Sequence, residues 1–211
     1  MTFANKLTLL RLALVPGFMV FMLFDNFWTR VAALVIFIVA SITDWYDGKI
    51  ARRTGTVTVV GTFLDPLVDK MLIAAALVGF VEMPELHIRA WMVVLIISRE
   101  FLITGLRSLA ASRGVVMAAD GVGKYKMASQ ITAIITILVI LILNSAFERW
   151  PTLSPGDIQW GIRMKEILER APFWLVFWVT LLTIVSGVLY LRKYSDLLKQ
   201  EFSMLKLAKL R

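Results

Sequence analysis

Six long apolar segments, joined mostly by short connections, constrain this chain more than any other feature. An α-helix needs roughly 17–25 mainly apolar residues to cross a bilayer, and each segment is about that long. A helix also pairs its own backbone N–H and C=O groups, which lipid cannot hydrogen-bond. We therefore predict an all-α, polytopic integral membrane protein with six transmembrane helices, in a single domain over residues 1–211. The predicted spans are Leu7–Phe24, Val31–Arg52, Thr62–Val81, Ala90–Ser112, Gly123–Asn144 and Phe173–Leu191.

The composition and the charge pattern agree with a membrane location. Hydrophobic residues make up 59% of the chain and charged residues 18%, whereas a soluble domain averages about half and about a quarter. A net charge of +8 would suggest nucleic-acid binding in a soluble protein. Here most Lys and Arg residues flank the predicted spans on the side of both termini, and the positive-inside rule makes that side cytoplasmic. We expect a multi-pass protein of the inner (cytoplasmic) membrane, surrounded by membrane lipids and not bound to nucleic acid.

Two connections have features of their own. The stretch over Ser145–Pro172 is the longest, and we predict an interfacial helix around Ile158–Leu168, on the non-cytoplasmic side. The single histidine, His87, follows Met83-Pro84 and is predicted to lie in a solvated loop. Since the chain has no cysteine, a thiolate metal site is excluded.

Five of the 15 acidic residues fall inside or at the edge of apolar spans: Asp44, Asp47, Asp65, Asp69 and Glu100. Such carboxylates are expensive in lipid and indicate function unless they are paired or solvated. Asp44 and Asp47 are three positions apart, and Asp65 and Asp69 are four apart, so each pair shares a helix face. If the two helix ends face each other at the cytoplasmic boundary, the four aspartates form one cluster.

Four ionised carboxylates side by side require positive charge between them. Mg²⁺ or Mn²⁺ is the natural partner of an all-oxygen site, and four carboxylates suit two such ions. An alternative is a set of helix caps and salt bridges, for which Arg52, Arg53 and Lys70 are available. A cap requires one carboxylate rather than four, so we predict a divalent-metal site near the cytoplasmic face.

The residues around the aspartates extend the pattern. The chain reads D-x2-D-G-x2-A-R-x8-G-x3-D-x3-D over residues 44–69. This pattern resembles the signature of the CDP-alcohol phosphotransferase family at every specified position. Residues 5–11 (NKLTLLR) also resemble the family's N-terminal segment, and 98–107 (SREFLITGLR) and 123–130 (GKYKMASQ) resemble its phosphatidylglycerophosphate synthase branch in particular. Met127 departs from that branch, which usually has threonine there.

The resemblance implies an enzyme that displaces CMP from CDP-diacylglycerol with an alcohol, and commonly a homodimer. In the family pattern all four aspartates hold the metal ions, and Asp69 also serves as general base on the acceptor hydroxyl. The active site would then face the cytoplasm. The residues implied in nucleotide binding are Asn5, Thr8, Asp47, Gly48, Ala51, Arg52, Gly61 and Asp65.

Basic residues in and after the fourth span suggest how the acceptor is chosen. Arg107, Lys124 and Lys126 are predicted at the cytoplasmic end, beside the metal site, and Arg99 lies deeper. Cationic side chains bind phosphate well, so the acceptor would be sn-glycerol 3-phosphate. The alternatives are an internal ion pair, such as Arg99 with Glu100, and an ordinary basic edge of a span.

Two other functions stay open at this point. A sister enzyme would use inositol phosphate, serine or phosphatidylglycerol as the acceptor. A divalent-cation transporter would also carry acidic residues in its spans, but it would place them near the bilayer midplane in symmetric halves. Here the acidic residues gather toward one face and no second half repeats them, which favours the enzyme.

Overall fold

The computed structural model describes residues 3–54, 59–112, 121–150 and 158–194. This part of the chain is helical, with six α-helices, one short 3₁₀ helix and no strand. Each predicted span corresponds to one of the α-helices, so the all-α prediction is confirmed. The elements are α1 (Phe3–Met22), α2 (Phe27–Thr54), α3 (Val59–Val81), η1 (Pro84–Leu86), α4 (Ala90–Ser112), α5 (Gly121–Arg149) and α6 (Ile158–Lys193).

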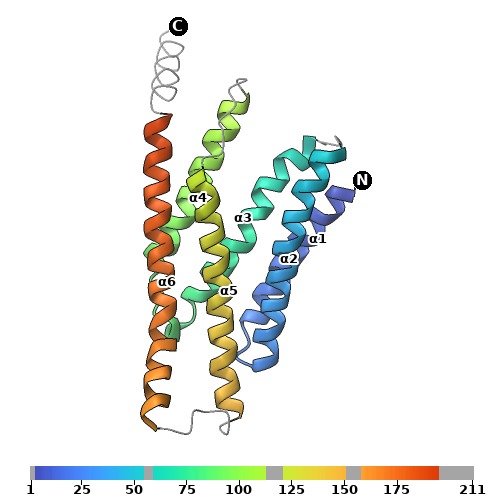
Figure 1. The fold of residues 1–211 in the computed structure, drawn as a ribbon. Coiled ribbons are helices and arrows are strands. Elements are labelled where there is room, and N and C mark those ends of the chain that lie inside the picture. The colour runs from blue at the N-terminus through green and yellow to red at the C-terminus, as the bar shows by residue number, and fades with distance from the viewer. Residues whose placement is uncertain (1–2, 55–58, 113–120, 151–157, 195–211) are drawn as a thin grey trace.

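The six α-helices run alternately up and down in one bundle (Figure 1). The start of α1 and the end of α6 consequently lie at the same end of the bundle, the upper end in this view. The end of α2, the start of α3, the end of α4 and the start of α5 lie toward that end as well. Helix α1 packs on α2 and α3, α5 packs between α2 and α6, and α4 packs on α3 and α6.

Turn residues at the opposite end close the helix pairs. The Asn26 side-chain oxygen accepts a hydrogen bond from the backbone N–H of Trp28 at 3.3 Å, which caps the start of α2. His87 ends η1 with φ 52° and ψ 17°, the left-handed conformation. It is exposed, so the predicted loop position of the histidine is confirmed.

The core of the bundle is a continuous set of buried aliphatic and aromatic side chains from all six α-helices. Phe18 of α1 and Phe37 of α2 are fully buried, with ring centroids 6.0 Å apart. Phe80 of α3, Met92 of α4, Ile137 of α5 and Val176 of α6 continue this core. Because the apolar core runs along the helices, the polar groups described below are exceptions to it.

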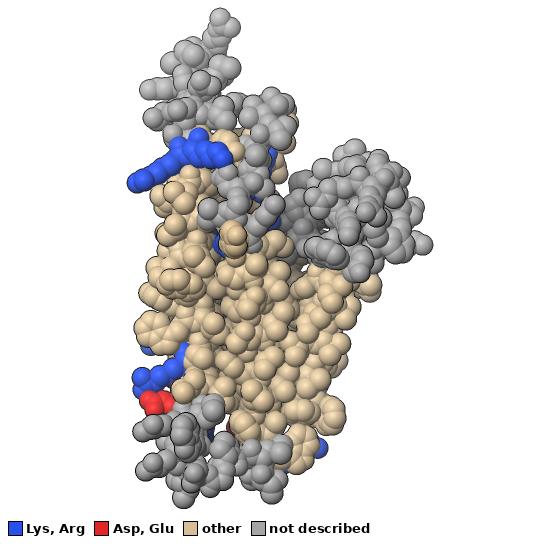
Figure 2. All heavy atoms as spheres, viewed as in Figure 1, with Lys and Arg blue, Asp and Glu red and all other residues tan. Residues whose placement is uncertain are grey.

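The outer surface is apolar over much of its height. Figure 2 shows a broad band of uncharged atoms, with Lys and Arg side chains toward both ends. Four tryptophans near predicted span ends, Trp28, Trp91, Trp150 and Trp174, are exposed, as expected of side chains that anchor at a membrane interface. Within the described residues, Tyr125–Arg149 and Lys165–Lys193 are long and apolar enough to cross a membrane, and Leu9–Met22, Phe27–Thr43 and Lys70–Val81 are shorter apolar helices.

The structure corrects one element of the prediction. Residues 158–168 do not form a separate interfacial helix, because they are the first turns of α6, which continues through Pro172 to Lys193. A proline inside a helix removes one backbone hydrogen bond, and the packing of α6 on α4 and α5 supports the helix on either side.

Candidate active site and metal centre

The four aspartates of the predicted metal centre lie on consecutive helices. Asp44 and Asp47 are in the second half of α2, and Asp65 and Asp69 are in the first half of α3. These parts of α2 and α3 lie at the same end of the bundle (Figure 1). The fold therefore brings the two carboxylate-bearing helix segments to one end of the bundle.

The side chains of these aspartates lie outside the described part of the structure. Among the residues whose side chains are described, no group of three or more His, Asp or Glu could hold a metal ion. The four aspartates thus stay the candidate ligands. Their chemistry fits Mg²⁺ or Mn²⁺, since both ions prefer carboxylate oxygens.

The predicted nucleotide-binding residues share that end of the bundle. Asn5 and Thr8 are in the first turns of α1, and Gly61 is in the first turn of α3. Gly48, Ala51 and Arg52 are near the end of α2. Their side-chain contacts also lie outside the described residues, as do those of Lys124, so their roles stay predictions.

A small pocket lies one helical turn below the aspartates. It is lined by Arg11 of α1, by Ser41 of α2 and Leu72 of α3, and by Met127 and Ile131 of α5. Ser41 precedes Asp44 by three residues and Leu72 follows Asp69 by three. Arg11 is only 2% exposed, so this pocket, about one helical turn from the aspartate positions, is lined by a buried arginine. From the sequence, Arg11 was expected only among the cytoplasmic charges and as part of the N-terminal motif.

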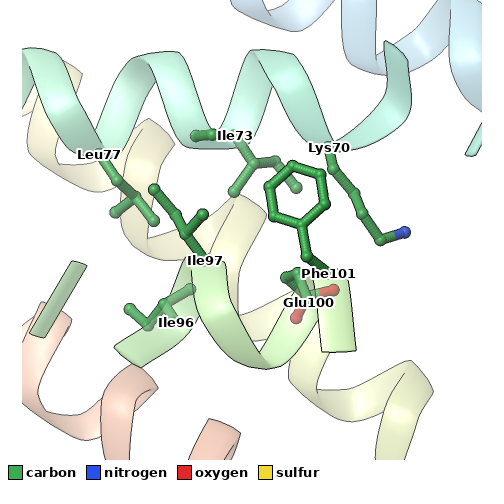
Figure 3. Close-up of a pocket in the computed structure, with 8 residues that line it drawn as sticks. Lys70, Ile73, Leu77, Ile96, Ile97, Glu100 and Phe101 are labelled. Atoms are coloured by element: carbon green, nitrogen blue, oxygen red, sulfur yellow. The ribbon is translucent and has the colours of Figure 1, made fainter. Parts of the chain in front are cut away.

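A second small pocket lies between α3 and α4. Figure 3 shows Lys70, Glu100 and Phe101 at one end of this pocket and Leu77 and Ile96 at the other. Lys70 directly follows Asp69, so this pocket connects the aspartate-bearing part of α3 to the polar part of α4.

Glu100 is the centre of a buried ion-pair network. Its carboxylate oxygen Oε1 forms an ion pair with the Lys126 ammonium and a second one with Arg99 Nη1, at 3.2 Å. Lys126 is 3% exposed, and the Glu100 side chain is 18% exposed. The internal pair of Arg99 with Glu100, an alternative reading of the sequence, is thus present. Lys126 lies inside the bundle and not on a solvated basic edge.

Arg107 belongs to the same region. Its Nε donates a hydrogen bond to the Tyr190 hydroxyl at 3.2 Å, and its guanidinium carbon lies 5.3 Å from the centroid of the Tyr190 ring. Arg99 and Arg107 repel each other electrostatically, and Lys126 is repelled by Arg99 and by Lys70. We call Arg99, Arg107 and Lys126 the basic cluster.

The basic cluster carries more positive than negative charge. Among the described side chains, two of its three cations, Arg99 and Lys126, pair with one carboxylate, that of Glu100, whereas Arg107 contacts the neutral Tyr190. Excess cationic charge inside an apolar bundle is unfavourable unless an anion binds there. The arrangement can therefore accept an anionic group, such as a phosphate.

Two α6 residues in this region, Ser186 and Tyr190, were not predicted from the sequence. Ser186 Oγ accepts a hydrogen bond from Arg99 Nη2 at 2.8 Å, and Tyr190 contacts Arg107 as described. The available signal was a serine and a tyrosine four residues apart in an otherwise apolar span. Polar residues at that spacing share a helix face, and in lipid they indicate a contact with another helix.

Comparison with known proteins decides the family. A family model described as CDP-alcohol phosphatidyltransferase matches residues 1–185. The chain belongs to this family. The resemblance noted from the aspartate pattern is thereby confirmed, and the match covers α1 to α5 and most of α6.

Individual family members similar to this chain carry one enzyme name. The CDP-diacylglycerol–glycerol-3-phosphate 3-phosphatidyltransferase of Bacillus subtilis is 40% identical over 209 residues, covering 92% of this chain and 96% of the relative. The protein of that name from Sodalis glossinidius is 34% identical over 179 residues, covering 81% and 88%. The Escherichia coli protein of that name is 39% identical over 138 residues, covering 63% and 74%.

Proposed function

We propose that this chain is a CDP-diacylglycerol–glycerol-3-phosphate 3-phosphatidyltransferase. It transfers the phosphatidyl group of CDP-diacylglycerol to sn-glycerol 3-phosphate and releases CMP. The 40% identity to a relative with this name, over nearly the whole of both chains, carries the proposal. The family match and the aspartate pattern support it.

The reaction exchanges one phosphorus–oxygen bond for another. A hydroxyl oxygen of glycerol 3-phosphate forms a bond to the phosphorus that bears the diacylglycerol, the bond from that phosphorus to the CMP oxygen breaks, and CMP leaves. The hydroxyl proton goes to the Asp69 carboxylate as general base. Such positioned proton transfer contributes roughly 10²–10⁴-fold to the rate of a reaction.

Two observations support a divalent-metal site. The four aspartates offer the carboxylate oxygens that Mg²⁺ and Mn²⁺ prefer, and the helix segments that bear them lie at one end of the bundle. We assign Asp44, Asp47, Asp65 and Asp69 as the ligands of two ions, Mg²⁺ or Mn²⁺. When bound, these ions would neutralise the pyrophosphate and stabilise the leaving group. Asn5, Thr8, Gly48, Ala51, Arg52 and Gly61 then surround the cytidine nucleotide, together with Asp47 and Asp65.

The basic cluster, with Lys124, is assigned to the phosphate of the acceptor. Its excess of cations over Glu100 is the supporting observation. A phosphorylated acceptor brings the negative charge that this region lacks, whereas serine or inositol does not. A phosphate dianion also forms charge-assisted hydrogen bonds with guanidinium groups.

We further propose that the six α-helices are six membrane spans, with both termini and the active site on the cytoplasmic side of the inner membrane, and that the protein is a homodimer. The alternating helix directions and the common end shared by the start of α1 and the end of α6 support a common side for both termini, and the excess of Lys and Arg on that side supports its assignment as cytoplasmic. The two longest apolar helices, α5 and α6, support insertion.

The test is CMP release by the purified protein in detergent, with CDP-diacylglycerol and Mg²⁺ or Mn²⁺. The acceptors compared are glycerol 3-phosphate, inositol phosphate, serine and phosphatidylglycerol, each with and without a chelator. We expect release that requires both glycerol 3-phosphate and the metal. CMP release that requires one of the other acceptors would contradict the proposed substrate. CMP release that the chelator does not reduce would contradict the metal assignment.

A further inference from the structure

Helix α6 contacts two of the three members of the basic cluster through one of its faces. Ser186 accepts a hydrogen bond from Arg99, and Tyr190, one turn later, accepts one from Arg107 and presents its ring to the same guanidinium. Both α6 side chains are buried, at 5% and 3% exposed. The contacts thus form inside the bundle, where they are shielded from solvent.

Gly187 lies between these two residues and is close to Arg99. A Cβ atom at Gly187 would lie 3.2 Å from Arg99 Cγ and 3.6 Å from Arg99 Nε. A methyl group there would push the arginine stem aside, because a contact of 3.2 Å is tighter than ordinary van der Waals distance. The absence of a side chain at Gly187 therefore lets Arg99 lie directly against α6.

These three residues lie beyond residues 1–185, the part matched by the family model. Their involvement with the basic cluster follows from the contacts in this structure. An arginine has many rotamers, and a guanidinium held in place before the ligand arrives loses less conformational entropy when it binds. A guanidinium has five N–H groups, so the bonds of Arg99 to Glu100 and Ser186 and that of Arg107 to Tyr190 leave further N–H groups available to an anion.

We infer that Ser186, Gly187 and Tyr190 are positioning residues, which hold the guanidinium groups of Arg99 and Arg107 in the orientation that binds the phosphate of the acceptor. This inference rests on the proposed function. The last turns of α6 consequently set the affinity for a phosphorylated acceptor. The affinity for CDP-diacylglycerol depends instead on the aspartate-bearing segments of α2 and α3.

The test measures steady-state kinetics of the full-length protein with Tyr190→Phe and with Ser186→Ala. Each change removes one oxygen atom, and Tyr190→Phe keeps the aromatic ring. Loss of a single hydrogen bond predicts a rise in the KM for glycerol 3-phosphate of about threefold to tenfold. The KM for CDP-diacylglycerol and the kcat should stay within about twofold of the parent values.

Matched controls come from the same helix. Tyr194→Phe makes the same chemical change one turn along, on a ring 4.8 Å from that of Tyr190. Thr183→Val removes a buried hydroxyl that has no hydrogen-bond partner among the described residues. Neither control should raise the KM for glycerol 3-phosphate. In an Arg107→Gln background, Tyr190→Phe should add nothing further, because Tyr190 acts through Arg107.

The outcomes separate this inference from the proposed function. If the parent protein releases CMP with glycerol 3-phosphate but Tyr190→Phe and Ser186→Ala behave like the controls, the positioning role is wrong and the proposed function stands. Equal rises in both KM values would also overturn it, since they would indicate a general structural effect. If the parent protein does not use glycerol 3-phosphate, both ideas fail. Ser186→Ala gives an independent result should Tyr190→Phe reduce folding.

Discussion

Glu100 is the residue on which the local charge balance depends. Its carboxylate contacts both Lys126 and Arg99, and a buried cation whose partner is removed destabilises a fold by about 3 kcal/mol. We predict that Glu100→Gln lowers the thermal unfolding temperature in detergent. Adding Lys126→Met should recover part of that loss, because the double variant no longer buries the ammonium.

The control for Glu100 is an acidic residue in an exposed ion pair. Glu166 pairs with Arg170 at 2.9 Å on the surface of α6, with side chains 57% and 71% exposed. Exposed pairs contribute little, so Glu166→Gln should leave the unfolding temperature nearly unchanged. A loss for Glu100→Gln no larger than that for Glu166→Gln would show that the buried network does not stabilise the bundle.

Asp69 is the proposed general base, and its role in proton transfer can be tested by a single substitution. Asp69→Asn keeps the shape of the side chain but removes its basicity, and we expect CMP release to fall by about 10²–10⁴-fold. Excess Mg²⁺ should not restore the rate, because the missing function is proton transfer. Glu148→Gln, an exposed change at the opposite end of the bundle, is the control. Recovery of Asp69→Asn at high Mg²⁺ would instead limit Asp69 to metal binding.

At the scale of helices, Arg30 links four elements at the end away from the candidate active site. From the start of α2 it donates hydrogen bonds to the backbone oxygen of Leu141 at 2.9 Å and to Ser145 Oγ at 2.6 Å, both in α5. It also forms ion pairs with Asp25, in the connection between α1 and α2, and with Glu85 in η1. A guanidinium that is 6% exposed therefore joins α2, α5 and both loops.

We predict that Arg30→Met destabilises the bundle without altering substrate preference. Removing a buried cation leaves the Leu141 and Ser145 oxygens short of a donor, and we expect a loss of about 2–4 kcal/mol, measured by thermal unfolding in detergent. The KM for glycerol 3-phosphate should not change, since the contacts lie at the other end. Arg149→Met, at an exposed position in the last turn of α5, provides the comparison. An altered acceptor KM would show that the two ends are coupled.

The helices themselves were predictable, since runs of apolar residues of this length have few alternatives in lipid. The error came at α6, where polar residues such as Arg163 and Lys165 suggested a separate surface helix. A sequence pattern cannot show that packing on α4 and α5 carries a helix through Pro172. For the same reason, the contacts of Ser186 and Tyr190 were not foreseen, because they depend on how α6 is rotated against α4.

At the scale of the whole molecule, the orientation in the membrane is directly testable. The chain has no cysteine, so a single introduced cysteine reports on one position alone. Glu148 is exposed near the end of α5, and Arg192 is exposed near the end of α6, at the opposite end of the bundle. A membrane-impermeant maleimide should label Glu148→Cys in intact cells and Arg192→Cys only after permeabilisation. The reverse pattern would contradict cytoplasmic termini.

The whole fold also explains which parts of the candidate site the sequence could predict. The aspartates fall at one end of the bundle because α2 and α3 are consecutive and antiparallel, and this follows from the order of the spans. Arg11, Glu100 and Lys126 come from three different helices. Their burial depends on how segments distant in the sequence pack together. Counting Lys and Arg residues near the ends of the predicted spans gives the orientation of the spans but not this packing.

The proposed transfer to glycerol 3-phosphate is tested most directly by following the acceptor into the product. Purified protein is incubated with CDP-diacylglycerol, Mg²⁺ and glycerol 3-phosphate labelled in its carbon atoms, and both the organic-extractable label and the released CMP are measured. We expect label to enter the lipid phase as phosphatidylglycerophosphate, with one CMP released for each molecule formed, and both to fall by about 10²–10⁴-fold with Asp69→Asn. Release of CMP without label in the lipid would contradict transfer to glycerol 3-phosphate.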